Sequence, residues 1–214
     1  MKEAFISLDL DFVQSPSFIG NMYGSKEYKS RSNYIPILKK WLSIDDLLKK
    51  LPERSHGDFV GDNSASIFQL QRLNNLKKFE EKPTYINIDQ HHNMYHHGKG
   101  DVHHYSLSTF KPFECNIGLF KEELISRFIW VIPDFFDEQD FAGHLTFQQE
   151  IAKDENTIKF HFMKDIIIEF EFIRWSDFDV KEYDVKFLSI VRNKNFTNTK
   201  TEELDDIRKT ISIW

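Results

Sequence analysis

Two short apolar segments of this chain end in side chains that are spaced for metal binding. The first segment carries Asp9 and Asp11, and the second carries Asp89 and His91, with one residue between the members of each pair. Alternate residues of a strand lie on the same face, so each pair can point at one ion. The simpler alternative is that each acid caps a helix or pairs with an arginine. Two such segments together favour a divalent-metal site at the ends of two strands.

The second segment continues into a histidine-rich stretch. Asn93 shares the face of Asp89 and His91 if the strand stays extended. A carboxylate beside an imidazole suits Mn, Fe or Zn, whereas Ca and Mg prefer shells made of oxygen. Six of the nine histidines lie between positions 91 and 104, and His103 and His104 are candidates for a general acid. The alternative is a polar loop whose histidines lie at the surface.

The composition limits the class of protein. The chain has 214 residues, of which 40% are apolar, and this suits one domain with a sizeable core over residues 1–214. Its net charge of −6 argues against non-specific nucleic-acid binding. The single cysteine excludes an intrachain disulfide framework, and no apolar run approaches the roughly 18 residues of a membrane span. We therefore expect a soluble cytoplasmic protein that binds neither nucleic acid nor membrane.

Strands and helices are expected to alternate through the first 130 residues. Strands are predicted at residues 4–11, 84–89, 128–133, 145–151, 157–163, 166–174 and 184–191. Helices are predicted at residues 35–51 with a restart at Ser43, and at 64–79, 117–128 and 200–211, whereas 14–34 and 90–112 are expected to be loops. This order favours an α/β fold with a largely parallel sheet, flanked by helices, and an antiparallel meander in the C-terminal third. Ligands of such sheets bind beyond the carboxyl ends of the strands, where both acid-bearing pairs fall.

The two motifs resemble the metal motifs of the arginase/deacetylase superfamily. They are most similar to those of a bacterial arginase-like family that includes the peptide arginases of ribosomal-peptide pathways. Weaker motifs of that family are collinear with nearly the whole chain. They correspond to Asp62 and Asn63 before the helix at 64–79, to Glu114 through Asn116, to Trp130 through Asp134, and to Leu188 through Thr197.

The resemblance implies a three-layer α/β/α fold and a site for two Mn²⁺ ions, or for one. Water activated by the metals would attack the guanidinium carbon of an arginine in a peptide substrate, which yields ornithine and urea. The implied metal ligands are Asp9, Asp11, Asp89, His91, Asn93 and Asp62. The implied catalytic residues are His103, His104, Glu114 and Asn116.

The chain departs from the family at two ligand positions. The last ligand of the second motif is Asp in the family and Asn93 here. The family places a metal-binding His before the helix at 64–79, where this chain has Asp62 and Asn63. These changes leave open a weakened second metal site, a one-metal enzyme, or a protein that binds a peptide or partner without catalysis. A one-zinc deacetylase and a metal phosphoesterase are further alternatives.

Overall fold

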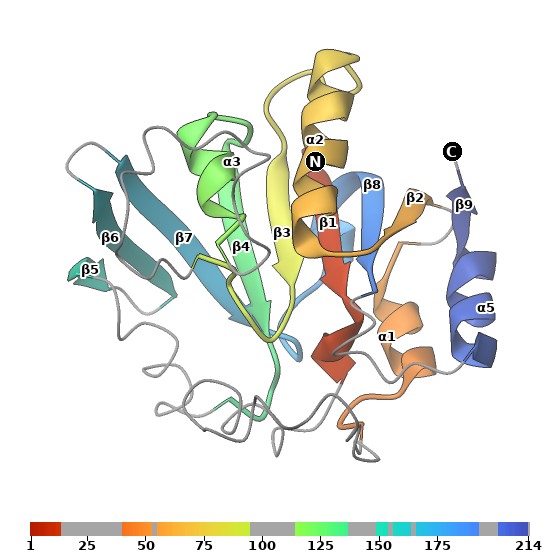
Figure 1. The fold of residues 1–214 in the computed structure, drawn as a ribbon. Helices are drawn as coiled ribbons and strands as arrows, with labels where there is room; N and C mark the ends of the chain where they lie inside the picture. Colours follow the sequence, from red (N-terminus) through yellow and green to blue (C-terminus); the bar gives the residue numbers. More distant parts are fainter. Residues whose placement is uncertain are drawn as a thin grey trace, which may run out of the picture.

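The computed structural model describes residues 1–13, 40–52, 55–94, 114–136, 149–153, 156–163, 166–192 and 201–213. Its strands are β1 (Lys2–Asp9), β2 (Ser55–Val60), β3 (Thr84–Ile88), β4 (Arg127–Ile132), β5 (Gln149–Lys153), β6 (Thr157–Met163), β7 (Ile166–Arg174), β8 (Tyr183–Val191) and β9 (Ile211–Ile213). Within the described residues they form one sheet in the order β5-β6-β7-β4-β3-β1-β8-β2-β9 (Figure 1).

Most of this sheet is parallel. Every pair of neighbours from β7 across to β9 is parallel, whereas β6 is antiparallel to both β5 and β7. The predicted α/β class is therefore confirmed, together with the antiparallel meander in the C-terminal third. The strands predicted at 157–163 and 166–174 have the same limits in the structure.

Among the described residues, two pairs of α-helices cover the two faces of the sheet. The helices are α1 (Ile44–Lys50), α2 (Asn63–Asn75), α3 (Ile117–Lys121) and α5 (Thr201–Thr210). Apolar residues of α1 and α5 join one buried cluster, and those of α2 and α3 join the other. These clusters give the three layers of an α/β/α arrangement. Among the described residues, no helix is long and apolar enough to cross a membrane.

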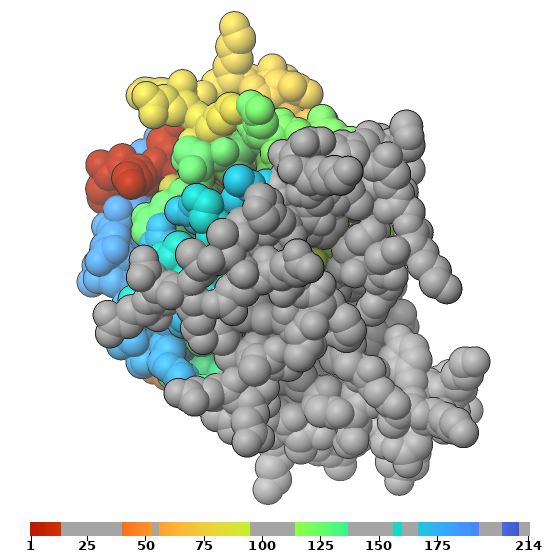
Figure 2. All heavy atoms as spheres, turned by 90° about the vertical axis from the view of Figure 1, so that its left-hand side faces the viewer, coloured from red at the N-terminus to blue at the C-terminus, as the bar shows by residue number. Residues whose placement is uncertain are grey.

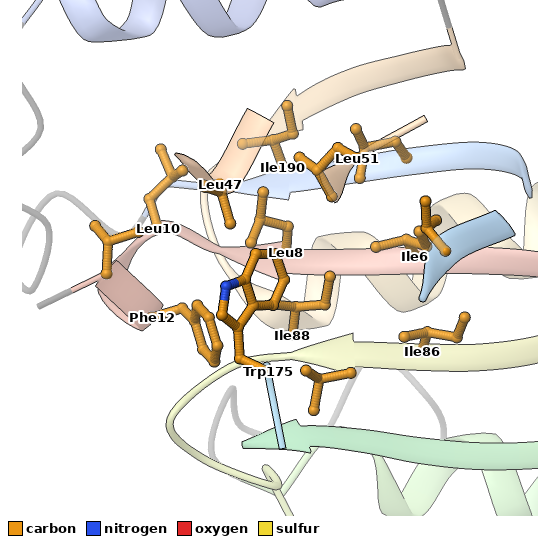
Figure 3. Packing of buried hydrophobic residues seen from close by; sticks show 14 of the residues in the cluster. Ile6, Leu8, Leu10, Phe12, Leu47, Leu51, Ile86, Ile88, Trp175 and Ile190 are labelled. Carbon is orange, nitrogen blue, oxygen red and sulfur yellow. The ribbon is translucent and has the colours of Figure 1, made fainter. Parts of the chain in front are cut away.

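The face under α1 and α5 carries a continuous apolar cluster. The residues of β1 that lie in its cluster are Ala4, Ile6, Leu8. Figure 3 shows Leu8 of β1 and Ile88 of β3 packed beside Trp175, with Leu47 of α1 close by. Each of these side chains is at most 5% exposed. The burial of apolar surface on this face stabilises the central strands.

The opposite face changes from apolar to polar along the strands. Phe5 of β1 stacks on Tyr85 of β3 with ring centroids 5.6 Å apart. Two residues further on, Ser7 lies in register with both Asn87 of β3 and Ser189 of β8, and all three are buried. Buried polar side chains therefore lie on one face of the sheet, close to the carboxyl ends of its strands.

The carboxyl ends of β1 and β3 meet at a topological switch point. The two strands are parallel neighbours whose arrowheads point the same way in Figure 1. The next described helix after β1 is α1, whereas the next after β3 is α3, and these helices lie in clusters on opposite faces. The chain therefore leaves the two strand ends in opposite directions. Ligands of α/β proteins bind at this kind of position.

At the amino ends of the parallel strands, the turns before β3 and β4 contact one another directly. The side chain of Asn74 in α2 donates to the carbonyl of Leu124 at 3.0 Å, and the backbone N–H of Ser126 donates to the carbonyl of Pro83 at 3.1 Å. Figure 2 shows the turn after α2 in yellow and the region of α3 in green at this end of the molecule. Turns therefore contact one another at the amino ends of the parallel strands, whereas the switch point lies at their carboxyl ends.

Four element predictions need correction. The helix expected at 117–128 ends at Lys121. Within the segment 35–51, residues 40–43 are not helical and 35–39 lie outside the described residues. The predicted restart at Ser43 is confirmed, because its side chain caps α1 by accepting the N–H of Asp46. The short strands β2 and β9 were not expected. The sequence of β2, Ser-His-Gly-Asp-Phe-Val, lacks apolar alternation because this strand lies near the edge of the sheet. The loop predicted at 14–34 lies outside the described residues.

Candidate metal centre

The first acid pair lies in a turn and not on a continuous strand. β1 ends at Asp9, and residues Leu10–Val13 form a 3₁₀ helix. The backbone N–H of Asp11 donates to Oδ1 of Asp9 at 3.0 Å. The expectation that both carboxylates project from one extended strand is therefore wrong. The side chain of Asp9 starts the turn by accepting the N–H two residues on, which is a common property of Asp in loops.

The second pair repeats this turn on the neighbouring strand. β3 ends at Ile88, and the backbone N–H of His91 donates to Oδ1 of Asp89 at 2.9 Å. Asn93 has a φ of 53°, so the chain does not stay extended and the condition for a shared strand face fails. The side chain of Asn93 instead returns to the site, where its Nδ2 donates to Oδ2 of Asp89 at 2.6 Å.

Buried side chains hold the backbone of this second turn. The Nε1–H of Trp130 in β4 donates to the carbonyl of Asp89, and Nδ2 of Asn87 donates to the carbonyl of His91, both at 2.8 Å. The side chain of Gln90 donates to the carbonyl of Asp11 at 2.7 Å and so joins the two turns. These hydrogen bonds fix the positions of the acids before any ligand binds, which is what a precise binding site requires.

Three of the predicted ligands converge. Asp11, Asp89 and His91 offer ligand atoms that all lie within 4.8 Å of one another. Nδ1 of His91 lies 3.3 Å from Oδ1 of Asp89 and 3.5 Å from Oδ2 of Asp11. Two ligand atoms that each lie about 2.1 Å from one ion are separated by about 3.0–3.4 Å. The two distances from Nδ1 of His91 are close to this range, and the ligand atoms of all three residues lie within 4.8 Å, so these side chains could hold a single divalent cation.

Two oxygen atoms of this cluster have unused capacity to accept. Oδ1 of Asp11 is buried and has no hydrogen-bond partner within the part of the chain that the structure describes. The same holds for Oδ1 of Asn63, the first residue of α2, which is 8% exposed. A buried carboxylate oxygen without a donor is unfavourable unless a cation or water satisfies it.

The carboxylates repel one another. Burial, and then the charges of Asp11 and Asp89, raise the pKa of Asp9 well above its ordinary value. Burial, and then the charge of Asp11, raises the pKa of Asp89 to about 6. Both shifts mean that the folded protein disfavours the ionised acids. A divalent cation among them would remove this penalty by supplying the missing positive charge.

Asp62 and Asn63 take different positions. Asp62 is the N-cap of α2, and its Oδ1 accepts the N–H of Ala65 at 3.0 Å. It does not belong to the convergent cluster, and a role for it as a ligand stays a prediction. Asn63 instead reaches the acids, and its Nδ2 donates to Oδ2 of Asp9 at 3.0 Å and to Oδ2 of Asp89 at 3.5 Å.

The residues predicted to be catalytic are divided between two settings. Glu114 and Asn116 lie in a buried turn that leads into α3. Nδ2 of Asn116 donates to the carbonyl of His92 at 2.8 Å, so Asn116 positions the turn after β3. His103 and His104 lie outside the described residues, and their predicted role as a general acid stays a prediction.

Sequence reasoning missed the residues that support the acids. Asn87 lies between Ile86 and Ile88 in a fully buried strand, and this polar residue was the available signal. Trp130 carried no comparable signal, because its indole reaches Asp89 only through the pairing of β3 with β4. In the sequence, Asn63 marked only a departure from the family's metal-binding His. Its role as a donor to two carboxylates follows from the start of α2 beside β1 and β3.

A separate cavity of about 450 Å³ lies away from this cluster. Its lining includes Arg127 and Phe128 at the amino end of β4, Phe120 of α3 and Glu171 of β7. The acids lie at the opposite, carboxyl ends of the parallel strands. The cavity is therefore not part of the candidate metal centre.

Comparisons with known proteins leave the family open. A scan against protein-family models finds no family that matches this chain, and searches of the curated proteins and of the solved structures find no match. The geometry of the site and the resemblance of its motifs therefore carry the functional proposal.

Proposed function

We propose that this protein is a metal-dependent hydrolase whose ion is held by Asp11, Asp89 and His91. The observation that carries the proposal is the convergence of these three ligand atoms at the switch point of a parallel sheet. Two carboxylates and an imidazole suit Mn²⁺, Fe²⁺ or Zn²⁺. Manganese is the metal that the resemblance to the arginase-like family favours.

The residues of the chain have separable roles in this proposal. Asp89 is a fixed ligand, because the N–H of His91 and the side chain of Asn93 hold its two oxygens in place. Asp11 is the ligand with free capacity, since its Oδ1 has no donor among the described residues. The chemistry that a divalent cation supplies when bound is Lewis-acid activation of water near neutral pH.

The substrate in this proposal is the guanidine of an arginine in a peptide, which is hydrolysed to ornithine and urea. This choice comes from the resemblance of the two acid-bearing motifs to those of the peptide arginases. The cluster supports it only through its charge, because a site with three carboxylates attracts a guanidinium group. The ligand set alone is equally compatible with a one-metal deacetylase.

Two measurements test the proposal. Tag-free protein is treated with a chelator, reloaded with Mn²⁺ and assayed for urea release from arginine-containing peptides, with Asp11→Asn as the variant. We expect urea from the wild type, none from the chelated protein, and none from Asp11→Asn. Metal binding without urea, but with acetate released from acetylated lysine peptides, would transfer the proposal to deacetylation. Failure to bind any divalent metal would contradict it.

A second candidate function is binding without catalysis. The observation that favours it is the pair of amide groups, from Asn63 and Asn93, that donate to Asp9 and Asp89. Carboxylates satisfied in this way are stable without a catalytic metal pair. For this candidate the metal-loaded protein would bind arginine-containing peptides in a calorimetric titration and leave them unchanged over long incubation.

A further inference from the structure

We propose that the site holds one metal ion, because the side-chain amides of Asn63 and Asn93 occupy the position that a second ion would take. This inference rests on the proposed metal binding and specifies its stoichiometry. It differs from the two-ion site that the resemblance implies, and it is carried by the directions of the hydrogen bonds on the carboxylates.

The two oxygen atoms of Asp89 face different partners. Oδ1 accepts the N–H of His91 and lies 3.3 Å from Nδ1 of the same residue. Oδ2 accepts Nδ2 of Asn93 at 2.6 Å and Nδ2 of Asn63 at 3.5 Å. Asp89 thus divides the cluster into an ion side, with Asp11 and His91, and an amide side, with Asn63 and Asn93.

Asp9 belongs to the amide side. Its Oδ1 accepts the N–H of Asp11 at 3.0 Å, and its Oδ2 accepts Nδ2 of Asn63 at 3.0 Å. The amide of Asn63 therefore bridges Asp9 and Asp89 by donating to Oδ2 of both. In a two-ion site these oxygens would bind the second cation. Here amide hydrogens point at them instead.

The two amides donate hydrogen bonds to the carboxylate oxygens that a second cation would bind. A hydrogen bond to an ionised carboxylate is about twice as strong as one between neutral groups. A cation on the amide side would meet the positive ends of two N–H dipoles and would have to displace them. Asn63 is 8% exposed and Asn93 is 4% exposed, so neither amide turns freely into solvent.

A second ion could enter only if an amide turned over. Oδ1 of Asn63 has no donor among the described residues, so a turned Asn63 would offer this oxygen to a cation. The turned amide would remove the Asn63 donor from Oδ2 of both Asp9 and Asp89, while Oδ2 of Asp89 would keep its donor from Asn93. The metal stoichiometry of the wild type therefore distinguishes the two arrangements.

Two isosteric substitutions convert the amide side into a cation site. Asn93→Asp is compatible with the backbone, because Asp tolerates the φ of 53° at this position. Asn63→Asp places an acid in the first turn of α2, which the helix dipole favours. Asn75→Asp, at the exposed end of the same helix, adds one charge far from the acids and is the matched control.

The experiment is a Mn²⁺ titration by calorimetry with elemental analysis, together with electron paramagnetic resonance of the loaded protein. We expect one equivalent for the wild type and for Asn75→Asp, and two equivalents for Asn63→Asp/Asn93→Asp. The double variant should also lose the isolated six-line manganese signal, because two nearby ions couple. Circular dichroism of each variant checks its fold.

Each outcome decides a different part of the proposal. Two equivalents in the wild type would overturn the inference and leave the proposed metal-dependent function intact. No metal in the wild type would overturn both. One equivalent in a folded double variant would show that the amides do not determine the stoichiometry. If the double variant does not fold, the wild-type count and Asn93→Asp alone decide between these outcomes.

Discussion

The two faces of the central strands show how one sheet provides both stability and a site. On the face of α1 and α5, β1 contributes Ala4, Ile6 and Leu8, all fully buried. On the face of α2 and α3, the same strand contributes Phe5, Ser7 and then Asp9. The apolar face keeps its character to the end of the strand, whereas the other face becomes polar toward the carboxyl end.

The difference between the faces shows where unfavourable burial is tolerated. A buried polar group destabilises a fold unless it is hydrogen-bonded. Ser7 is satisfied by the hydroxyl of Ser66 in α2 at 2.9 Å, and Asp9 by Asn63. Asp11 keeps a carboxylate oxygen without a donor among the described residues. Oδ1 of Asn87 and Oγ of Ser189 on this face also have no partner among the described residues. Of these unsatisfied atoms, the carboxylate oxygen of Asp11 is the one that carries charge and lies in the convergent cluster.

The largest expected effect on stability comes from a substitution on the apolar face. Leu8→Ala removes a fully buried side chain from the cluster under α1 and should lower the free energy of unfolding by about 4 kcal/mol. Urea unfolding measures it. The folded variant should still bind Mn²⁺ with the wild-type stoichiometry, because no atom of Leu8 belongs to the polar face. Loss of metal binding in the folded variant would contradict the separation of the two faces.

The next effect is a pH dependence that comes from the polar face. The pKa of Asp89 is raised to about 6 in the folded protein, compared with about 3.9 for an unfolded Asp. The folded state therefore binds this proton more tightly, and the metal-free protein should lose stability as pH rises from about 4 to above 6. The contribution of Asp89 to this loss should be on the order of 3 kcal/mol, and the raised pKa of Asp9 acts in the same direction.

Unfolding by urea at several pH values, with and without Mn²⁺, measures this dependence. Saturating Mn²⁺ should restore stability at pH 7.5, because the ion supplies the positive charge that the proton supplied at low pH. Asp89→Asn removes the ionisable group, so the metal-free variant should show a weaker pH dependence and no response to Mn²⁺. A metal-free wild type that becomes more stable above pH 6 would contradict the account of the acids.

A smaller effect tests the support of the second turn. Trp130→Phe keeps the ring in the core and removes the hydrogen bond from Nε1 to the carbonyl of Asp89. We expect a loss of about 1 kcal/mol in stability and a weaker affinity for Mn²⁺, both measured on the same sample. The control is Phe128→Leu. Phe128 lies two residues before Trp130 on β4, so this change alters the same face of the sheet without removing a hydrogen bond to Asp89. Its affinity should stay at the wild-type value.

The smallest expected effect tests whether Asp62 acts only as the N-cap of α2 or also as a metal ligand. Asp62→Asn keeps a good N-cap for α2, because Asn and Asp are about equally favoured there, so stability should change by only a few tenths of a kcal/mol. Mn²⁺ affinity should also stay unchanged, because the side chain of Asp62 is engaged with the N–H of Ala65. A large loss of affinity would instead establish Asp62 as a ligand.

The fold was predictable where apolar patterns are strong. The buried strands β3, β4 and β8 and the antiparallel β6 and β7 were expected close to their observed limits. β2, which lies next to the edge, and the edge strand β9 were not, because the sequence of β2 lacks apolar alternation and β9 has three residues. Short or partly exposed strands depend on their neighbours more than on their own sequence.

The candidate site was predictable in composition but not in geometry. Asp11, Asp89 and His91 were expected from their spacing, and they converge. The expected arrangement was only partly right. The three side chains are brought together by the turns that Asp9 and Asp89 close, and not by extended strands. The hydrogen bonds of the two amides could not be predicted, since they depend on the start of α2, which is distant in sequence from both turns.

The central claim is that Asp11, Asp89 and His91 bind one divalent cation, and a Mn²⁺ titration of tag-free protein at pH 7.5 tests it most directly. The wild type should bind one equivalent. His91→Ala and Asp11→Asn should bind none, while His56→Ala, an exposed histidine on β2, should bind as the wild type does. Equal binding by all four proteins, or no binding by the wild type, would contradict the claim.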